Sequence, residues 1–204
     1  MNSSAESKTV QTGARLCCLL ALNVQTATQD AEQVRTGSPA MREAAARIYA
    51  ANIAHKDVGA TCRDLLQPFF ADPEETVRTQ AAHAFRHISE LDTAEQSKLL
   101  AAFLDANPSG AALEPVIRAL VGSHVRLPDL VCRLIETGVS AFKTEAGDIR
   151  TAGARIASDL SKIVIRLYTQ SDDAIIRKRC LEAIDSMEHA GFFGLSAELG
   201  RIDR

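Results

Sequence analysis

The stretch that decides the fold is residues 72–85, which read DPEETVRTQAAHAF. It opens with Asp72 and Pro73, a pair typical of a helix start, because proline is tolerated at the first position, where no N–H partner is needed. An aliphatic residue and an arginine follow at Val77 and Arg78, and two alanines come one turn later. The stretch therefore predicts a helix with one apolar side, on which small residues let a neighbouring helix approach closely.

The same order of residues recurs along the chain. Residues 38–48 read SPAMREAAARI and residues 171–181 read SDDAIIRKRCL, while 117–120 and 148–154 are weaker echoes. In each copy we expect the aliphatic residue to pack inward and the arginine to reach an acid or a loop carbonyl of the next copy. The residues that define the pattern are Met41, Arg42, Asp72, Pro73, Val77, Arg78, Ala81, Ala82, Ile176 and Arg177.

This pattern resembles the HEAT-like repeats, which are pairs of helices that stack into a superhelix, over roughly residues 37–190. The resemblance implies an all-α fold, a right-handed alpha-solenoid of about four to five helix pairs. It also suggests the C-terminal helical region of a larger multidomain bacterial protein. The aliphatic-arginine pairs are spaced by 36, 40, 32 and 27 residues. The last spacing is too short for two helices and a turn, so either Ile149–Arg150 or Ile176–Arg177 is a coincidence.

Composition independently favours helices. The 204 residues include 33 alanines, two tyrosines and no tryptophan, and no alternation of β-branched residues supports a sandwich or barrel. Pro68 should end or kink its helix. Caps and periodicity predict helices at about 8–34, 39–54, 58–70, 74–90, 93–106, 111–122, 128–143, 147–169, 173–190 and 195–202.

The expected organisation has four parts. Residues 1–7 are expected to be disordered, 8–36 to form an N-terminal helical layer, and 37–190 to form the repeat stack. Residues 191–204 offer an apolar stripe that we expect to fold over the last pair as a cap, as terminal repeats do. The N-terminal layer is as apolar as an internal helix, which suggests two alternatives: the chain is the C-terminal helical end of a larger protein, or it needs a partner at this layer.

The net charge and the cysteine content limit the possible functions. The net charge is −3 and the pI about 6.0, which weighs against nucleic-acid binding, since phosphate neutralisation needs a basic face. No run reaches the 18 or so apolar residues of a membrane span, and the short run at 16–22 does not fit a signal core. We expect a cytoplasmic protein in which Cys17, Cys18, Cys62, Cys132 and Cys180 are buried hydrophobes under reducing conditions.

Catalytic and metal motifs are weak in this sequence. His83 and His87 stand four apart on one face of the predicted helix, with Glu90 three residues further on, which makes them weak metal candidates. No third ligand is identifiable, and ordinary surface histidines are the favoured interpretation. No phosphate loop or nucleophile elbow occurs, so no cofactor is expected. The basic cluster Arg177–Arg179 is interpreted as a self-neutralised face.

Three functions are open at this stage. The leading one is a non-catalytic scaffold or regulatory module, with Arg63, Lys98 and Arg133 facing a protein partner from the inner helices. The second is a HEAT-like DNA-binding protein or DNA glycosylase, which the scarcity of aromatic residues disfavours. The third is a regulatory arm of a larger enzyme. It differs from the first only in the partner.

Overall fold

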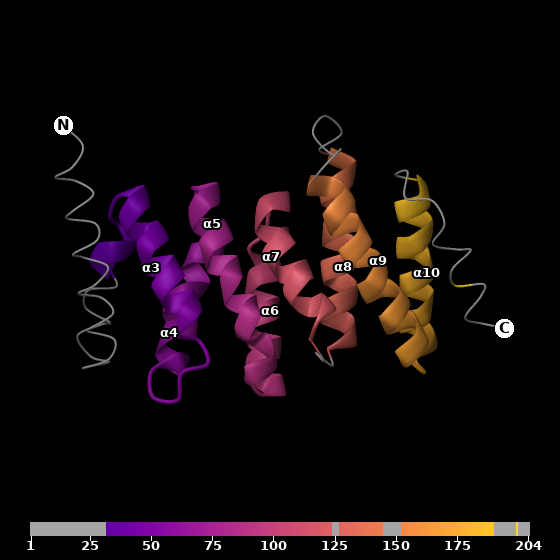
Figure 1. Ribbon diagram of the computed structural model, residues 1–204, viewed down its shortest axis with the longest axis horizontal. Coiled ribbons are helices and arrows are strands. Elements are labelled where there is room, and N and C mark those ends of the chain that lie inside the picture. The colour runs from indigo at the N-terminus through magenta and orange to yellow at the C-terminus, as the bar shows by residue number, and fades with distance from the viewer. Residues whose placement is uncertain (1–31, 124–126, 145–151, 190–198, 200–204) are drawn as a thin grey trace. The chain divides into compact units, whose positions relative to one another are not determined.

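The structure, a computed structural model, describes residues 32–123, 127–144, 152–189 and 199, and every regular element in these residues is a helix (Figure 1). The all-α prediction is confirmed. The elements are α3 (Pro39–Ala51), α4 (Gly59–Leu66), η1 (Gln67–Ala71), α5 (Glu75–Ala82), η2 (His83–Glu90), α6 (Thr93–Asp105), α7 (Gly110–Val121), α8 (Pro128–Thr144), α9 (Ala152–Gln170) and α10 (Ala174–His189).

Several predicted features fall outside the described residues. These are the disordered start at 1–7, the N-terminal layer up to residue 31, the Ile149–Arg150 pair and nearly all of the C-terminal cap. Of the cap, Leu199 is described, and it is helical and buried. Within the described part of the chain, no helix is both long and apolar enough to cross a membrane.

Two predicted helices change type part-way. The helix that contains Pro68 ends as an α-helix at Leu66 and continues as the 3-10 helix η1, in agreement with the break expected at proline. The helix predicted over 74–90 is α-helical only to Ala82, and the remainder is the 3-10 helix η2.

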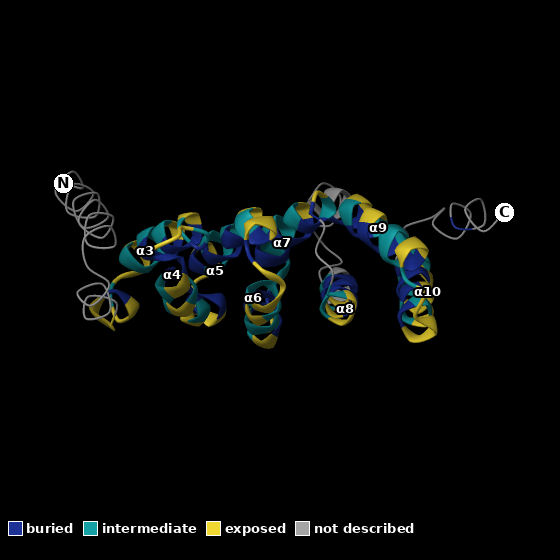
Figure 2. Ribbon diagram, turned by 90° about the horizontal axis from the view of Figure 1, so that it is seen from below, coloured by how far each residue is buried: buried dark blue, intermediate teal, exposed yellow. Residues whose placement is uncertain are grey.

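The chain divides into two compact units, Met1–Pro115 and Val116–Arg204. In the first unit, α3 packs against α4 and α5, and η1 packs against α4, α5 and α6. Figure 2 shows α3 and α5 in one layer and α4 and α6 in the other. Ala45 and Ala46 on α3, and Ala81 and Ala82 on α5, are fully buried, so small residues accompany the α3–α5 packing as the sequence predicts.

An aromatic cluster fills the first unit. Phe70 from η1, Phe85 from η2 and Phe103 from α6 meet at ring-centroid distances of 5.2–6.2 Å, and each side chain is at most 1% exposed. The two edge-to-face pairs, both with Phe103, contribute about 0.5–1.5 kcal/mol each beyond their buried area. The 3-10 segments thus supply two of the three rings of this cluster.

The second unit is built on α8, α9 and α10, each of which packs against the other two. Gly138 on α8 permits the close approach of α9, because a Cβ there would lie 2.9 Å from a terminal carbon of Leu160. Arg166 on α9 donates to the carbonyl oxygens of Leu120 and Val121 at 2.6 and 2.8 Å, and so satisfies the C-terminal end of α7.

Candidate functional site

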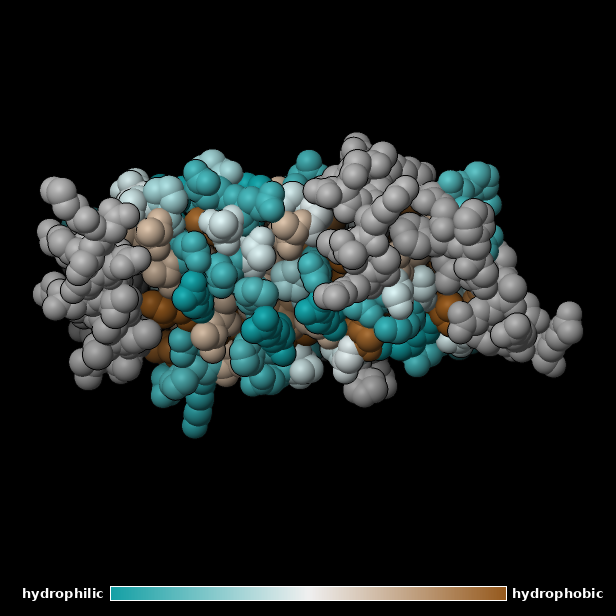
Figure 3. Space-filling model, turned by 45° about the horizontal axis from the view of Figure 1, so that its top comes forward, coloured by the Kyte–Doolittle hydropathy of each residue, from teal (hydrophilic) through white to brown (hydrophobic). Residues whose placement is uncertain are grey.

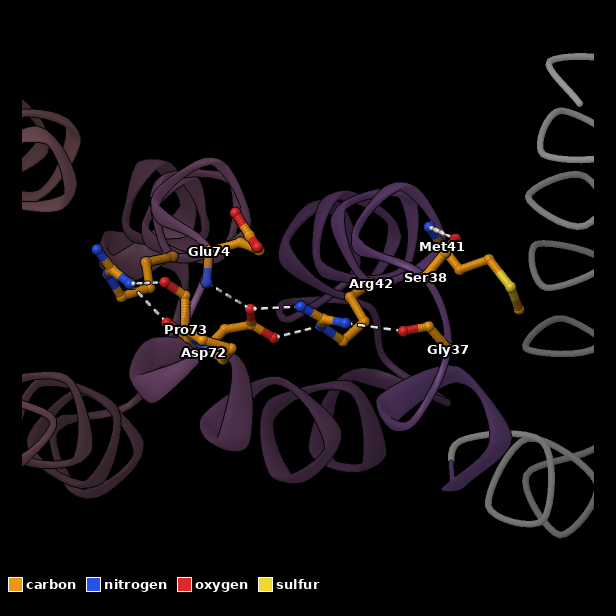
Figure 4. A network of polar contacts seen from close by, with 8 residues as sticks. Gly37, Ser38, Met41, Arg42, Asp72, Pro73 and Glu74 are labelled. Atoms are coloured by element: carbon orange, nitrogen blue, oxygen red, sulfur yellow. Dashed lines mark hydrogen bonds and ion pairs between the residues drawn. The ribbon is translucent and has the colours of Figure 1, made fainter. Parts of the chain in front are cut away.

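The most buried polar network of the first unit joins α3 to the segment before α5 (Figure 4). The Arg42 guanidinium donates to both carboxylate oxygens of Asp72, at 2.7 and 3.1 Å, and to the carbonyl of Gly37 at 2.7 Å. The Asp72 carboxylate also accepts the backbone N–H of Glu74 at 2.9 Å. The hydrogen bond to Asp72 raises the pKa of Arg42 above its ordinary value. This bidentate pair therefore fixes α3 against the next segment of the chain.

Arg78 reaches loop carbonyls, but they belong to its own copy of the pattern, whereas the sequence predicts a contact with the next copy. Its guanidinium donates to the carbonyl oxygens of Asp72 and Pro73 at 2.6 and 2.8 Å. Arginines of the pattern thus reach an acid in one case and loop carbonyls in the other. Both contacts converge on the turn that precedes α5.

Asp72 differs from its predicted role. The sequence suggested a helix N-cap at Asp72 followed by Pro73 at the first helical position, but α5 begins at Glu75 and its N-cap is Glu74. The carboxylate of Asp72 instead turns toward Arg42, where two charge-assisted bonds replace one capping bond. The corresponding prediction for α3 is confirmed, because Ser38 accepts the N–H of Met41 and Pro39 is the first helical residue.

A second set of charges joins α4 to α6. We call Arg63, Asp64, Glu95 and Lys98 the α4–α6 seam. Arg63 is ion-paired with Glu95, and Lys98 with Asp64 at 2.8 Å. The seam is positioned by local structure, since the capping box of Asp92 and Glu95 starts α6. The seam therefore carries two opposite-charge pairs between these helices, of which the pair of Asp64 and Lys98 is the more exposed.

Arg63 also contacts the backbone of the turn before α4. Its guanidinium donates to the carbonyl of Ile53. Gly59 is required beside this contact, because a Cβ there would lie 2.5 Å from the same carbonyl oxygen. Glycine therefore allows the chain to pass close enough for Arg63 to hold the loop before α4.

The three residues predicted to face a partner differ in how far their side chains are exposed. The side chain of Arg63 is 15% exposed and is used within the chain, whereas that of Lys98 is 66% exposed beside an equally exposed Asp64. Arg133 is exposed on α8, in the other unit. A partner-facing role thus stays a prediction, and Lys98 is the member of the three that offers the most surface in the first unit.

Another charged contact joins α8 to α10. We call Asp129, Cys132, Glu136, Arg179 and Cys180 the α8–α10 seam. Arg179 donates to Glu136 at 2.8 Å and to Asp129 at 3.3 Å. The hydrogen bond to Glu136 raises the pKa of Arg179. The charge of Arg179 is therefore neutralised, as predicted for the basic cluster, and the neutralising carboxylates lie on α8.

The rest of that cluster is also engaged near its own helix. Lys178 pairs with Glu182 at 3.7 Å, and the Arg177 guanidinium lies 4.4 Å from the centroid of the Tyr168 ring. Ile176 is buried, as expected of an aliphatic residue in the pattern. Arg177 therefore stacks on an aromatic ring of α9.

The α8–α10 seam also brings two cysteines together. Cys132 and Cys180 are 2% and 1% exposed, and Arg179, the neighbour of Cys180 in the sequence, pairs with the residues that flank Cys132 on α8, Asp129 and Glu136. Sequence analysis missed this pair, because 48 residues separate the two cysteines and no spacing motif links them. The one available signal was that each lies on the apolar side of its own helix.

The histidines do not share one face as predicted. His83 and His87 lie in the 3-10 helix η2, where three residues make a turn, so residues four apart point in directions about 120° apart. His87 binds Glu90 at 2.7 Å instead. Among the residues that the structure describes, no group of three or more metal-ligating side chains is placed to hold an ion.

Comparisons with protein-family models, with curated proteins and with solved structures give no match for this chain. Inference about its function therefore starts from its own residues.

Proposed function

We propose that the chain is a non-catalytic interaction scaffold or regulatory module, built as a right-handed alpha-solenoid of HEAT-like helix pairs. Two features of the first unit support this. Successive helices of the first unit alternate between two layers. Arg42 on α3 binds Asp72 in the turn before α5, which is the next helix in the same layer. Stacked helix pairs linked in this way commonly present one layer to a partner.

The observation that carries the proposal is the mixed charge of the α4–α6 seam. Asp64 and Lys98 are 64% and 66% exposed, and the less exposed Arg63 and Glu95 form a second pair between the same two helices. A nucleic acid presents one sign of charge and selects a contiguous basic surface. Exposed charges of both signs suit a protein surface of complementary pattern, where they set specificity and register more than affinity.

The described surface is consistent with a partner held by polar contacts. In the view of Figure 3, hydrophilic side chains cover much of the described face, and the hydrophobic areas are small and separate. The exposed large hydrophobic residues of the described chain are Ile175 and Leu181, both on α10. The first unit therefore favours recognition through charge.

A charge swap tests the proposal. Asp64→Lys combined with Lys98→Asp keeps the net charge and an opposite-charge pair but inverts the pattern that a partner meets. Because both side chains are largely exposed, the swap should change stability by less than about 1 kcal/mol. The matched control swaps the exposed Glu43 and Arg47 pair on α3, in the other layer.

Each protein serves as bait in a lysate of the source organism, and bound proteins are quantified by mass spectrometry. We expect specific partners that the wild type and the α3 swap retain in equal amounts and the α4–α6 swap loses. Equal recovery with all three baits, or recovery of nucleic acid alone, would contradict the proposal.

A further inference from the structure

The α8–α10 seam brings two buried cysteines to one helix packing. Cys132 lies on α8 and Cys180 on α10, and the two helices pack against each other. Arg179 spans the same two helices beside them through Glu136 and Asp129. Arg179 adjoins Cys180, and its two partners lie one turn before and one turn after Cys132 on α8, so the two cysteines belong to the facing sides of the packed helices.

The two thiols are electrostatically unequal. The neighbouring thiol of Cys180 lowers the pKa of Cys132, and the Arg179 guanidinium lowers it further, against the opposing effects of burial and of the neighbouring carboxylates of Glu136 and Asp129. The Cys132 thiol and burial raise the pKa of Cys180. Cys132 is therefore the thiol that becomes a thiolate, and Cys180 is the one that keeps its proton.

We propose that Cys132 and Cys180 form a redox-active dithiol site, which hydrogen peroxide converts into a disulfide between α8 and α10. This site is independent of the proposed scaffold function. It requires only the packing of the second unit.

The chemistry balances in two steps. The Cys132 thiolate attacks one oxygen of hydrogen peroxide, so that an S–O bond forms, the O–O bond breaks, and hydroxide leaves and takes up the thiol's proton as water. Cys132 is then a sulfenic acid. The sulfur of Cys180 next attacks the sulfur of Cys132, the S–O bond breaks, and the hydroxyl leaves as water with the Cys180 proton. In total the two thiols lose two electrons and peroxide gains them.

Burial sets the rate of the first step. With Cys132 and Cys180 at most 2% exposed, peroxide reaches the sulfur when the seam opens locally. Cys62 on α4 is an internal reference, since it is fully buried as well and its pKa is raised by burial to about 11. Two units above the ordinary value of 9.0 correspond to about a hundredfold less thiolate at neutral pH.

Peptide mapping of the full chain tests the site. The reduced protein is treated with hydrogen peroxide, blocked with N-ethylmaleimide and digested with trypsin without reduction. Cys132, Cys180 and Cys62 then fall in the separate peptides 127–133, 180–201 and 57–63. We expect a disulfide-linked species of the first two peptides, reversible by dithiothreitol, at a rate on the order of tenfold or more above the oxidation of Cys62.

Two variants assign the roles. In Cys180→Ser the resolving thiol is missing, so the sulfenic acid at Cys132 should persist and be trapped by dimedone. In Cys132→Ser, Cys180 should react no faster than Cys62. Far-ultraviolet circular dichroism checks that each variant is folded.

The wild-type map is decisive even where a variant fails to fold. Retention of free thiols at both positions to the same extent as at Cys62 would overturn the proposal. Conversion of Cys132 to a sulfinic acid without the linked peptide would overturn it as well.

Discussion

Replacing Asp72 with alanine should destabilise the first unit far more than removing a surface charge does. The substitution leaves the Arg42 guanidinium without either carboxylate oxygen, and it leaves the N–H of Glu74 without its acceptor. The side chains of Arg42 and Asp72 are 13% and 6% exposed, so water replaces these bonds poorly. The loss is therefore expected in the free energy of unfolding.

The magnitude follows from these contacts. Breaking a fully buried pair by removing one partner costs about 3–5 kcal/mol. Arg42 keeps its bond to the Gly37 carbonyl and some contact with water, which reduces the cost to about 2–4 kcal/mol. Asp72→Asn preserves an acceptor for Glu74 and removes the charge, so it should cost about half as much.

The assay is urea unfolding followed by far-ultraviolet circular dichroism, together with thermal unfolding. The transition temperature should fall by about 2–4 °C for each kcal/mol lost. The matched control is Glu43→Ala, which breaks an exposed pair with Arg47 on α3 and should cost less than about 0.5 kcal/mol.

A double-mutant cycle of Asp72→Ala with Arg42→Met isolates the pair from other effects of each substitution. We expect an interaction energy of about 1–3 kcal/mol between the two positions. An interaction energy below about 0.5 kcal/mol would refute the reasoning, as would equal destabilisation by Asp72→Ala and Glu43→Ala.

Three further outcomes are expected. Gly138→Val should destabilise the second unit by about 1–3 kcal/mol because its side chain would intrude on Leu160, whereas Gly122→Val meets an open site. Arg166→Met should cost about 1–3 kcal/mol in the free energy of unfolding, since two carbonyls at the end of α7 lose their donor. Burial raises the pKa of Cys62 to about 11, so the unfolded chain loses this proton first and stability should fall by about 2–3 kcal/mol between about pH 9 and 11.

Controls accompany these three. For the two glycine variants, the loss in the free energy of unfolding is compared between Gly138→Val and Gly122→Val. Equal losses would disprove the close approach of α8 and α9. For Arg166, the exposed Lys162→Met on the same helix is the reference, and a similar cost in both would show that the carbonyl contacts contribute little. For Cys62, the wild-type curve of stability against pH is compared with that of Cys62→Ala. Parallel curves would show that folding does not raise the pKa of Cys62.

Local features of the fold were predictable because neighbouring residues determine them. The start of α3 follows from Ser38 and Pro39, and the end of α4 from Pro68. The residue order also predicted that Arg42 reaches an acid of the next segment, because it directly follows an aliphatic residue that packs inward. The first two inferences use spacings of one helical turn or less, whereas the pair of Arg42 and Asp72 joins residues 30 positions apart.

Features that depend on register between helices were not predictable. The choice of Asp72 between capping α5 and binding Arg42 is decided by how closely α3 approaches. The 3-10 geometry that turns His83 away from His87 is set within a core of aromatic rings. The placement of Cys132 and Cys180 in one helix packing needs the alignment of α8 with α10, which no local spacing near either cysteine indicates.

The most direct measurement for the central claim is the dissociation constant of a captured protein partner, determined by calorimetry with purified components. For the α4–α6 swap of Asp64 and Lys98, we predict at least a tenfold weakening, which corresponds to about 1.4 kcal/mol. The α3 swap of Glu43 and Arg47 should leave the constant unchanged. Equal constants for both swaps and the wild type would contradict the claim that the α4–α6 seam recognises the partner.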